Sequence, residues 1–211
     1  MPVGKVIFLN GVTSSGKSSL AGALQRTLGE PYLHADADTV KEMSLGIPPA
    51  ERGEAFERAA FMPGLYAAIP GCFAALALFG NNLIVEDVAR PLQLRNYTES
   101  FAGCEVLLVS VRCHLEELER RERERADRQI GRAREQVEQG IVHALDIQDL
   151  EVDTAREPAE ACALTIKRRL DLGARPTAFA RLSAMSIERI WRMTDAMDRS
   201  IYQAAHPDLR V

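Results

Sequence analysis

The stretch that most constrains the fold of this chain is the run GVTSSGKS at residues 11–18. It follows an apolar, β-branched run at residues 6–9, which is typical of a strand buried on both faces. It leads into residues 17–28, where leucine and alanine recur at helical spacing before a glycine. A glycine-rich turn between a buried strand and a helix presents backbone N–H groups at the positive end of the helix dipole. The sequence therefore predicts a loop that holds phosphate groups.

Each position of this loop has a physical role. Gly11 allows the tight turn, and Gly16 lets the backbone wrap closely round an anion. Lys17 would place its ammonium between the β- and γ-phosphates of a nucleotide, and the Ser18 hydroxyl would ligate Mg²⁺. The alternative, a Gly/Ser turn with a surface lysine, is disfavoured by the strand before it and the helix after it. The predicted nucleotide-binding residues are Gly11, Val12, Thr13, Ser14, Ser15, Gly16, Lys17, Ser18, Ser19 and, from a later segment, Arg121.

Strand-like and helix-like segments alternate along the whole chain. Further strands are expected at residues 31–36, 83–87, 105–111 and 150–154. Helices are expected at residues 39–43, 55–61, 65–79, 91–101, 114–127, 158–170 and 183–205. Because most of the strands are continuously apolar, the pattern predicts an α/β fold, a three-layer sandwich with a five-stranded, mostly parallel sheet and helices on both faces. In such sheets ligands bind at the carboxyl ends of the strands.

Composition limits the classes of protein this can be. The 211 residues, 46% hydrophobic and 27% charged, suit one domain with a full core and an appendage. We divide the chain into a domain at residues 1–172, with a lid at about 127–140, and a C-terminal helical extension at 173–211. The net charge of −4 disfavours a general nucleic-acid-binding surface, and no apolar run is long enough to span a membrane. Four cysteines without metal-ligand spacing are expected to be buried free thiols in a reducing cytoplasm.

Acidic side chains end two of the expected strands. Asp36 and Asp38 follow the second strand, and Glu86 and Asp87 end the strand LIVED. Mg²⁺ keeps most of its waters and needs only one or two carboxylates. We assign Asp87 to the magnesium water shell, with Ser18 and Asp36 as the other predicted metal-binding residues. The alternative for Glu86 is a capping or hydrogen-bonding role.

The pair Asp36 and Asp38 suggests what happens to the phosphate. On an extended segment, two carboxylates two residues apart point the same way, one towards a metal and the other towards an acceptor hydroxyl. An ATPase or a GTPase switch needs no carboxylate here, because its acceptor is water. A kinase for a small alcohol benefits from one, since the carboxylate orients the hydroxyl and takes its proton late. The alternative is that both acids cap the helix expected near Thr39, and capping is the specific rival role of Asp38.

An arginine-rich segment follows the strand at 105–111. Spacings of four, three and four residues put its arginines on one helical face: Arg121, Arg125, Arg128 and Arg132. Glutamates at 116, 117, 119, 122 and 124 are interleaved, so the alternative is a solvated, ion-paired face, which we prefer for Arg120, Arg123 and Arg134. Because the segment runs into a stretch flanked by glycines at 131 and 140, we predict a lid. We assign Arg125 and Arg128 to the transferring phosphoryl group, beside Lys17 and Asp38.

The order of these motifs resembles that of the chloramphenicol phosphotransferases. The matching pieces are FLNGVTSSGKSSL, PYLHADADTV, LIVEDV, VSVRCHLEELERRERERADR and LEVDT, and the resemblance spans residues 6–170. The family is similar in fold to shikimate and adenylate kinases and transfers the ATP γ-phosphoryl to a primary hydroxyl of the antibiotic. The resemblance implies ATP and Mg²⁺ as cofactors and matches the family's catalytic aspartate to Asp38. Asp36 stands where the family tends to have a small residue, so its assignment rests on the DxD pattern.

Two segments depart from the family pattern. Residues 42–80 should form the acceptor pocket, and this stretch gives no match. The C-terminal helix has a stripe of Ile190, Met193, Met197 and Ile201, which either covers the core or forms a homodimer face. The expected function is an ATP-dependent kinase for a hydroxyl of a small molecule, such as an antibiotic. The alternatives are a metabolite or nucleotide kinase of the same fold, or a regulatory nucleotide-binding module.

Overall fold

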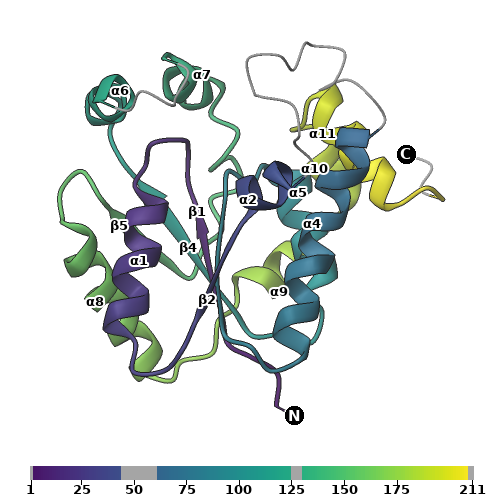
Figure 1. Cartoon of the computed structure of the whole chain (residues 1–211). Helices are drawn as coiled ribbons and strands as arrows, with labels where there is room; N and C mark the ends of the chain where they lie inside the picture. Colours follow the sequence, from purple (N-terminus) through teal and green to yellow (C-terminus); the bar gives the residue numbers. More distant parts are fainter. Residues whose placement is uncertain (1, 44–60, 125–129, 209–211) are drawn as a thin grey trace.

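Five parallel strands form a sheet at the centre of the computed structural model, which describes residues 2–43, 61–124 and 130–208 (Figure 1). The strands run in the spatial order β2-β3-β1-β4-β5, so that the strand before the phosphate loop is the central one. Their bounds are β1 Val6–Asn10, β2 Leu33–Asp36, β3 Leu83–Asp87, β4 Val106–Arg112 and β5 Leu150–Asp153. All four pairings are parallel, as the apolar runs predict.

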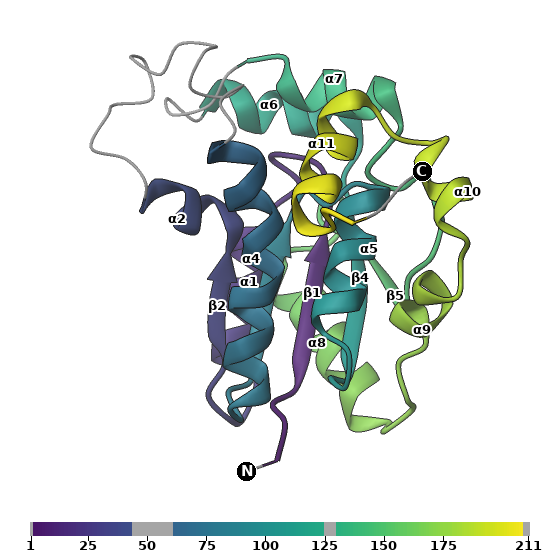
Figure 2. The ribbon, with the colours of Figure 1, turned by 90° about the vertical axis from the view of Figure 1, so that its right-hand side faces the viewer.

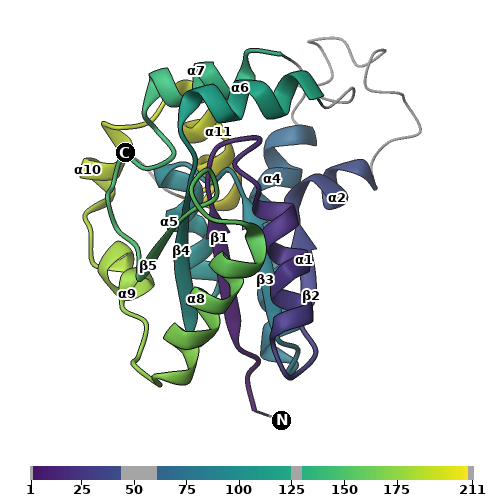
Figure 3. The same ribbon diagram turned by 90° about the vertical axis from the view of Figure 1, so that its left-hand side faces the viewer.

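Helices cover both faces of this sheet, which confirms the predicted three layers (Figures 2 and 3). One face packs against α1 (Lys17–Thr27) and α8 (Ala159–Asp171), and the other against α4 (Phe61–Leu78), α5 (Pro91–Ser100) and α9 (Ala178–Ser183). At the carboxyl edge lie α2 (Ala37–Glu42), α6 (Leu115–Glu124) and α7 (Arg132–Gln139). The helix expected at residues 55–61 lies almost wholly outside the described residues.

The C-terminal segment is not one helix, and this expectation was wrong. After α9 the chain forms α10 (Ile187–Trp191) and α11 (Ala196–Ala205). The break falls at Asp195, whose side chain accepts a hydrogen bond from the backbone N–H of Asp198, the interaction of a helix N-cap. Ile201 and Tyr202 of α11 are buried within the chain, and α11 packs on α4 and α5. The helix thus covers the core, the first of the two expected alternatives, and the division of the chain at residue 172 stays a prediction.

Hydrogen bonds and ion pairs connect α11 to α5. Glu99 accepts hydrogen bonds from Arg95 and from the Tyr202 hydroxyl, at 2.5 and 2.9 Å, and the His206 ring lies 2.7 Å from its second oxygen. Arg90, directly before α5, pairs with Asp195 at 2.6 Å. The extension is therefore held by polar anchors at both ends of α11.

The burial of the cysteines differs from the expectation, and the length and apolarity of the helices bear on a membrane span. Cys162 is buried, but Cys72 is exposed on the outer side of α4, so the thiols are not all buried. Within the ranges that the structure describes, no helix has the length and apolarity needed to cross a membrane.

Asp198 generates a prediction about stability and pH. It is buried beside Arg90, and burial raises the pKa of its carboxyl to about 6, against the pull of the guanidinium. The folded state therefore binds this proton more tightly than the unfolded state. The contribution of Asp198 to the free energy of unfolding is therefore full below about pH 4 and is lost as the pH rises through about 6. Asp198→Asn should remove this dependence, so that the free energies of unfolding of wild type and variant diverge by about 2–3 kcal/mol between pH 4 and 7. Denaturant unfolding at each pH measures both free energies. A constant difference between wild type and variant from pH 4 to 7 would contradict the raised pKa of Asp198.

Candidate active site

The phosphate loop connects β1 to α1 and needs glycine at two positions. Gly16 has a φ of 86°, a left-handed conformation that suits glycine. A Cβ on Gly16 would lie 3.1 Å from Nη1 of Arg121, and one on Gly11 would lie 2.5 Å from the carbonyl oxygen of Val111. The loop therefore wraps tightly between β4 and α6, as the motif predicts.

Lys17 lies across its own loop. Its ammonium donates hydrogen bonds to the carbonyl oxygens of Gly11 and Val12, both at 2.9 Å, and the side chain is buried. The loop thus holds a cation at its centre, together with the first N–H groups of α1. This is an arrangement that can bind the phosphates of a nucleotide.

Ser18, the serine of the motif, contacts Glu86 at the end of β3. The Ser18 hydroxyl donates to Oε1 of Glu86 at 2.8 Å, and His34 Nε2 lies 3.5 Å from the other carboxylate oxygen. Burial alone would raise the pKa of Glu86, but the hydrogen bonds from His34 and Ser18 and the charge of Lys17 hold it below its ordinary value. The interaction between His34 and Glu86 also raises the pKa of His34. Glu86 is thus a charged carboxylate that lies beside the loop and is only 6% exposed.

Asp87, the predicted metal acid, lies on the opposite side of the strand. Successive side chains of a strand point to opposite faces. Ile84 packs on the α1 side and Val85 on the α5 side, so Glu86 faces the loop and Asp87 faces α5. Asp87 accepts hydrogen bonds from the Tyr97 hydroxyl at 3.0 Å and from the Val88 N–H at 2.8 Å. The alternation of side chains along this strand is the sequence signal that could have identified Glu86, rather than Asp87, as the acid beside the loop.

Asp36 and Asp38 do not share an extended segment, because α2 begins at Ala37 rather than near Thr39. Asp36 caps this helix: its carboxylate accepts from the N–H groups of Asp38 and Thr39, at 3.0 and 3.3 Å. The expected geometry of two parallel carboxylates was therefore wrong, and the capping role falls to Asp36. Asp38 lies in the first turn of α2 and is exposed.

Arg121 lies against the phosphate loop. It donates to the carbonyl oxygen of Ser14 at 3.4 Å and to Thr154 at 3.0 and 2.7 Å. The Thr154 hydroxyl in turn donates to the carbonyl oxygen of Ser15 at 2.6 Å. These bonds join the loop to α6 and to the end of β5. Arg121 thus lies beside the loop, as expected for a nucleotide-binding residue.

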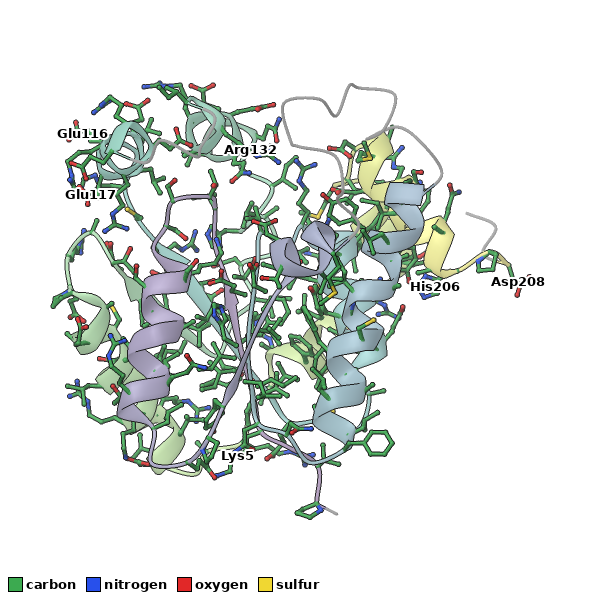
Figure 4. The ribbon with its side chains drawn as sticks, viewed as in Figure 1. Lys5, Glu116, Glu117, Arg132, His206 and Asp208 are labelled. Carbon is green, nitrogen blue, oxygen red and sulfur yellow. The ribbon has the colours of Figure 1, made fainter. Side chains whose placement is uncertain are left out.

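The four predicted arginines do not lie along one described helix. α6 ends at Glu124 and α7 begins at Arg132, after Gly131 with a φ of 94° (Figure 4). Arg125 and Arg128 lie outside the described residues, so their assignment stays a prediction. Two arginines expected to be surface ion pairs are confirmed as such: Arg120 pairs with Glu117 and Glu124, and Arg134 with Glu119 and Glu138.

Two side chains that the sequence reasoning missed hold α7 in place. Glu122 was expected on a solvated face, but it is buried and accepts hydrogen bonds from the N–H groups of Gly131 and Ala133, at 3.0 and 2.7 Å. Gln136 is also buried, and its Oε1 accepts from the N–H of Thr13 at 2.7 Å. The signal for Gln136 was its position three residues after Ala133, on the apolar side of the helix. α7 is thus joined directly to the phosphate loop.

Gln136 should matter for stability. Gln136→Leu leaves the buried Thr13 N–H without this acceptor, so it should lower the free energy of unfolding by about 1–3 kcal/mol. Gln136→Glu keeps an acceptor oxygen at the same reach and should lose less. Denaturant unfolding of both variants without nucleotide measures the difference, and equal losses would show that the hydrogen bond contributes little.

A parallel sheet of this order, with a GxxxxGKS loop after its central strand, defines a phosphotransferase of the P-loop kinase fold. The chain belongs to the chloramphenicol phosphotransferase-like family, whose model matches residues 4–171.

Named relatives and solved structures agree with this class. Two proteins of Mycobacterium tuberculosis, from strains CDC 1551 and H37Rv, are each 32% identical over 205 residues, covering 86% of this chain and 89% of theirs. Their names describe inferred O-phosphotransferases. An APS kinase of M. tuberculosis in complex with AMPPNP and APS has 19% identity and a TM-score of 0.58, covering 81% of this chain and 99% of that one.

Other solved structures of the same fold have similar identities and TM-scores. A shikimate kinase of Acinetobacter baumannii in complex with shikimate has 15% identity and a TM-score of 0.57, covering 81% of this chain and 94% of that one. A tunicamycin resistance protein of Deinococcus radiodurans has 16% identity and a TM-score of 0.55, covering 79% and 95%. At such identities the likeness shows the fold alone.

Proposed function

We propose that this protein transfers the γ-phosphoryl group of ATP to a hydroxyl of a small molecule. The observation that carries the proposal is the pairing of a cationic phosphate loop with two carboxylates, Glu86 at the end of β3 and Asp38 in the first turn of the helix after β2. Lys17 and the N–H groups of the loop would bind the phosphates, and Arg121 with Thr154 would border the nucleotide. Asp38 would bind the acceptor hydroxyl.

The residues present fit a magnesium ion. A serine hydroxyl and a buried, ionised carboxylate meet at 2.8 Å beside the loop, and Mg²⁺ typically takes one or two protein carboxylates besides waters and phosphate oxygens. Ser18 and Glu86 would hold the ion or its water shell, whereas Asp87, our first choice from sequence, and Asp36 are tied to Tyr97 and to the start of α2. When bound, the metal neutralises charge on the β- and γ-phosphates.

The protein's own part in the reaction is to position the two substrates. Phosphoryl transfer has a loose transition state, so alignment and charge stabilisation carry most of the catalysis. Lys17 would stabilise the charge on the phosphates, and Asp38 would orient the hydroxyl and accept its proton as the new P–O bond forms. Arg125 and Arg128 are proposed to neutralise the transferring phosphoryl group.

The acceptor is proposed to be a hydroxylated antibiotic such as chloramphenicol, which membership of the family supports. A small metabolite is the second candidate, because solved neighbours of the same fold include kinases in complex with APS and with shikimate. A panel of hydroxylated antibiotics and metabolites, incubated with ATP and Mg²⁺ and read by mass, should show one phosphorylated product. A panel without any phosphorylated product would favour the regulatory nucleotide-binding module.

Glu86 and Asp87 provide a matched test of the metal site. Glu86→Gln keeps the size of the side chain but removes the charge beside Ser18, so the magnesium concentration needed for half-maximal activity should rise about tenfold or more. Asp87→Asn should change it little. The activity measured across a magnesium titration distinguishes the two, and the reverse order would restore Asp87 as the metal acid.

Asp38 provides the test of the acceptor side. Asp38→Asn should keep the affinity for ATP and lower the transfer rate by about 10²-fold or more, the usual effect of a general base. Affinity is measured with a non-hydrolysable ATP analogue, and transfer by product mass. Transfer at a near wild-type rate would show that Asp38 is not the base.

A further inference from the structure

The outer face of α4 is apolar and open to solvent. Residues 61–80, which run from the start of the helix to just beyond it, contain no charged residue and no Ser, Thr, Asn, Gln or His. The inner side packs in the core through Ile69, Phe73, Ala74 and Ala77. The opposite side is exposed along its length at Ala68, Gly71, Cys72, Ala75, Leu76 and Phe79.

Such a helix is unusual for a surface. A helix that is apolar all round is normally buried, whereas a surface helix carries polar residues on its outer side. Phe79 is 72% exposed, Leu78 47% and Leu76 41%. Leu33 at the start of the edge strand β2 is 44% exposed, and its N–H donates to the carbonyl oxygen of Asn82, just beyond α4. The start of the edge strand β2 is thus joined to the segment that directly follows α4.

We propose that this face is the interface of a homodimer, with α4 of one copy packed antiparallel against α4 of a second copy. The face is self-complementary about Cys72. With Cys72 on the two-fold axis, Ala68 of one copy meets Leu76 of the other, and Phe79 meets the turn at Gly64 and Leu65. Ala68 thus opposes the larger Leu76, and Gly64 leaves room for Phe79, as close helix packing requires.

The available area suits a dimer. Taking roughly 200 Å² for a fully exposed large side chain, the apolar residues of the patch offer roughly 500 Å² per copy, or about 1,000 Å² for the pair. The total for the pair reaches the size at which specific interfaces begin. The patch on one copy is as large as the largest apolar patches of single proteins, which are often functional.

Charge disfavours the other occupants. Helices that lie on membranes typically carry Lys and Arg along their polar side, and α4 has none within a chain of net charge −4. A partner that docks through ion pairs would find no charged group on the helix. The proposed α4 interface is not the homodimer face that the sequence suggested on the C-terminal helix. Ile201 and Tyr202 of that helix, α11, are already buried within the chain.

The test compares two matched surface changes. Light scattering during gel filtration should give the wild type twice the chain mass of 23.3 kDa. The double variant Leu76→Glu, Phe79→Glu should give the chain mass, and Leu172→Glu, at a residue 79% exposed after α8, should stay dimeric. A monomeric wild type, or a double variant that stays dimeric, overturns the proposal. A monomer that binds phosphatidylglycerol vesicles through Phe79 overturns it in favour of a membrane surface.

Cys72 gives a second measurement that does not disturb the interface. With Cys104→Ser and Cys113→Ser, Cys72 is the exposed thiol and Cys162 is buried. A short thiol-specific crosslinker should join two chains through Cys72. The control carries Cys72→Ser and Leu172→Cys in the same background and should not be joined. Crosslinking of the control at the same yield would show random collision and overturn the two-fold arrangement.

Discussion

Buried and partly buried hydrogen bonds that tie the phosphate loop to the elements around it are the constraint on which the site depends. Ser18 is joined to Glu86 on β3, Ser15 to Thr154 after β5, and Thr13 to Gln136 on α7. The loop's shape is therefore set by residues up to 139 positions away in sequence. Because unsatisfied buried polar groups are costly, these partners fix where the helices at the carboxyl edge can lie.

In the proposed function, this arrangement separates the donor side of the site from the acceptor side. The face of β3 that carries Glu86 belongs to the loop and α1, and the face that carries Asp87 belongs to Tyr97 and α5. α2 begins directly after β2 and carries Asp38 at its first turn. One sheet edge thus presents a cation for phosphates and carboxylates beside it, which is the chemistry that a phosphotransferase needs.

The sequence predicted the sheet, its parallel strands and the loop, because each depends on local apolar runs and on glycines that the backbone requires. It failed where a choice depended on side-chain direction or on distant partners. The helix start at Ala37 made Asp36 a cap, and the pleat of β3 put Glu86 rather than Asp87 at Ser18. The roles of Glu122 and Gln136 depend on where α6 and α7 pack, which composition could not give. The break at Asp195 was readable in principle, since aspartate favours an N-cap over a helix interior.

The most direct test of the account follows the phosphorus atoms themselves. Phosphorus NMR of one reaction, containing the protein, ATP, Mg²⁺ and a hydroxylated acceptor from the panel, distinguishes transfer from hydrolysis. The account predicts that the γ-phosphate signal falls while ADP and a phosphomonoester rise in equal amounts, without inorganic phosphate. Inorganic phosphate released at the same rate with and without the acceptor, or ATP left unchanged with every acceptor, would contradict it.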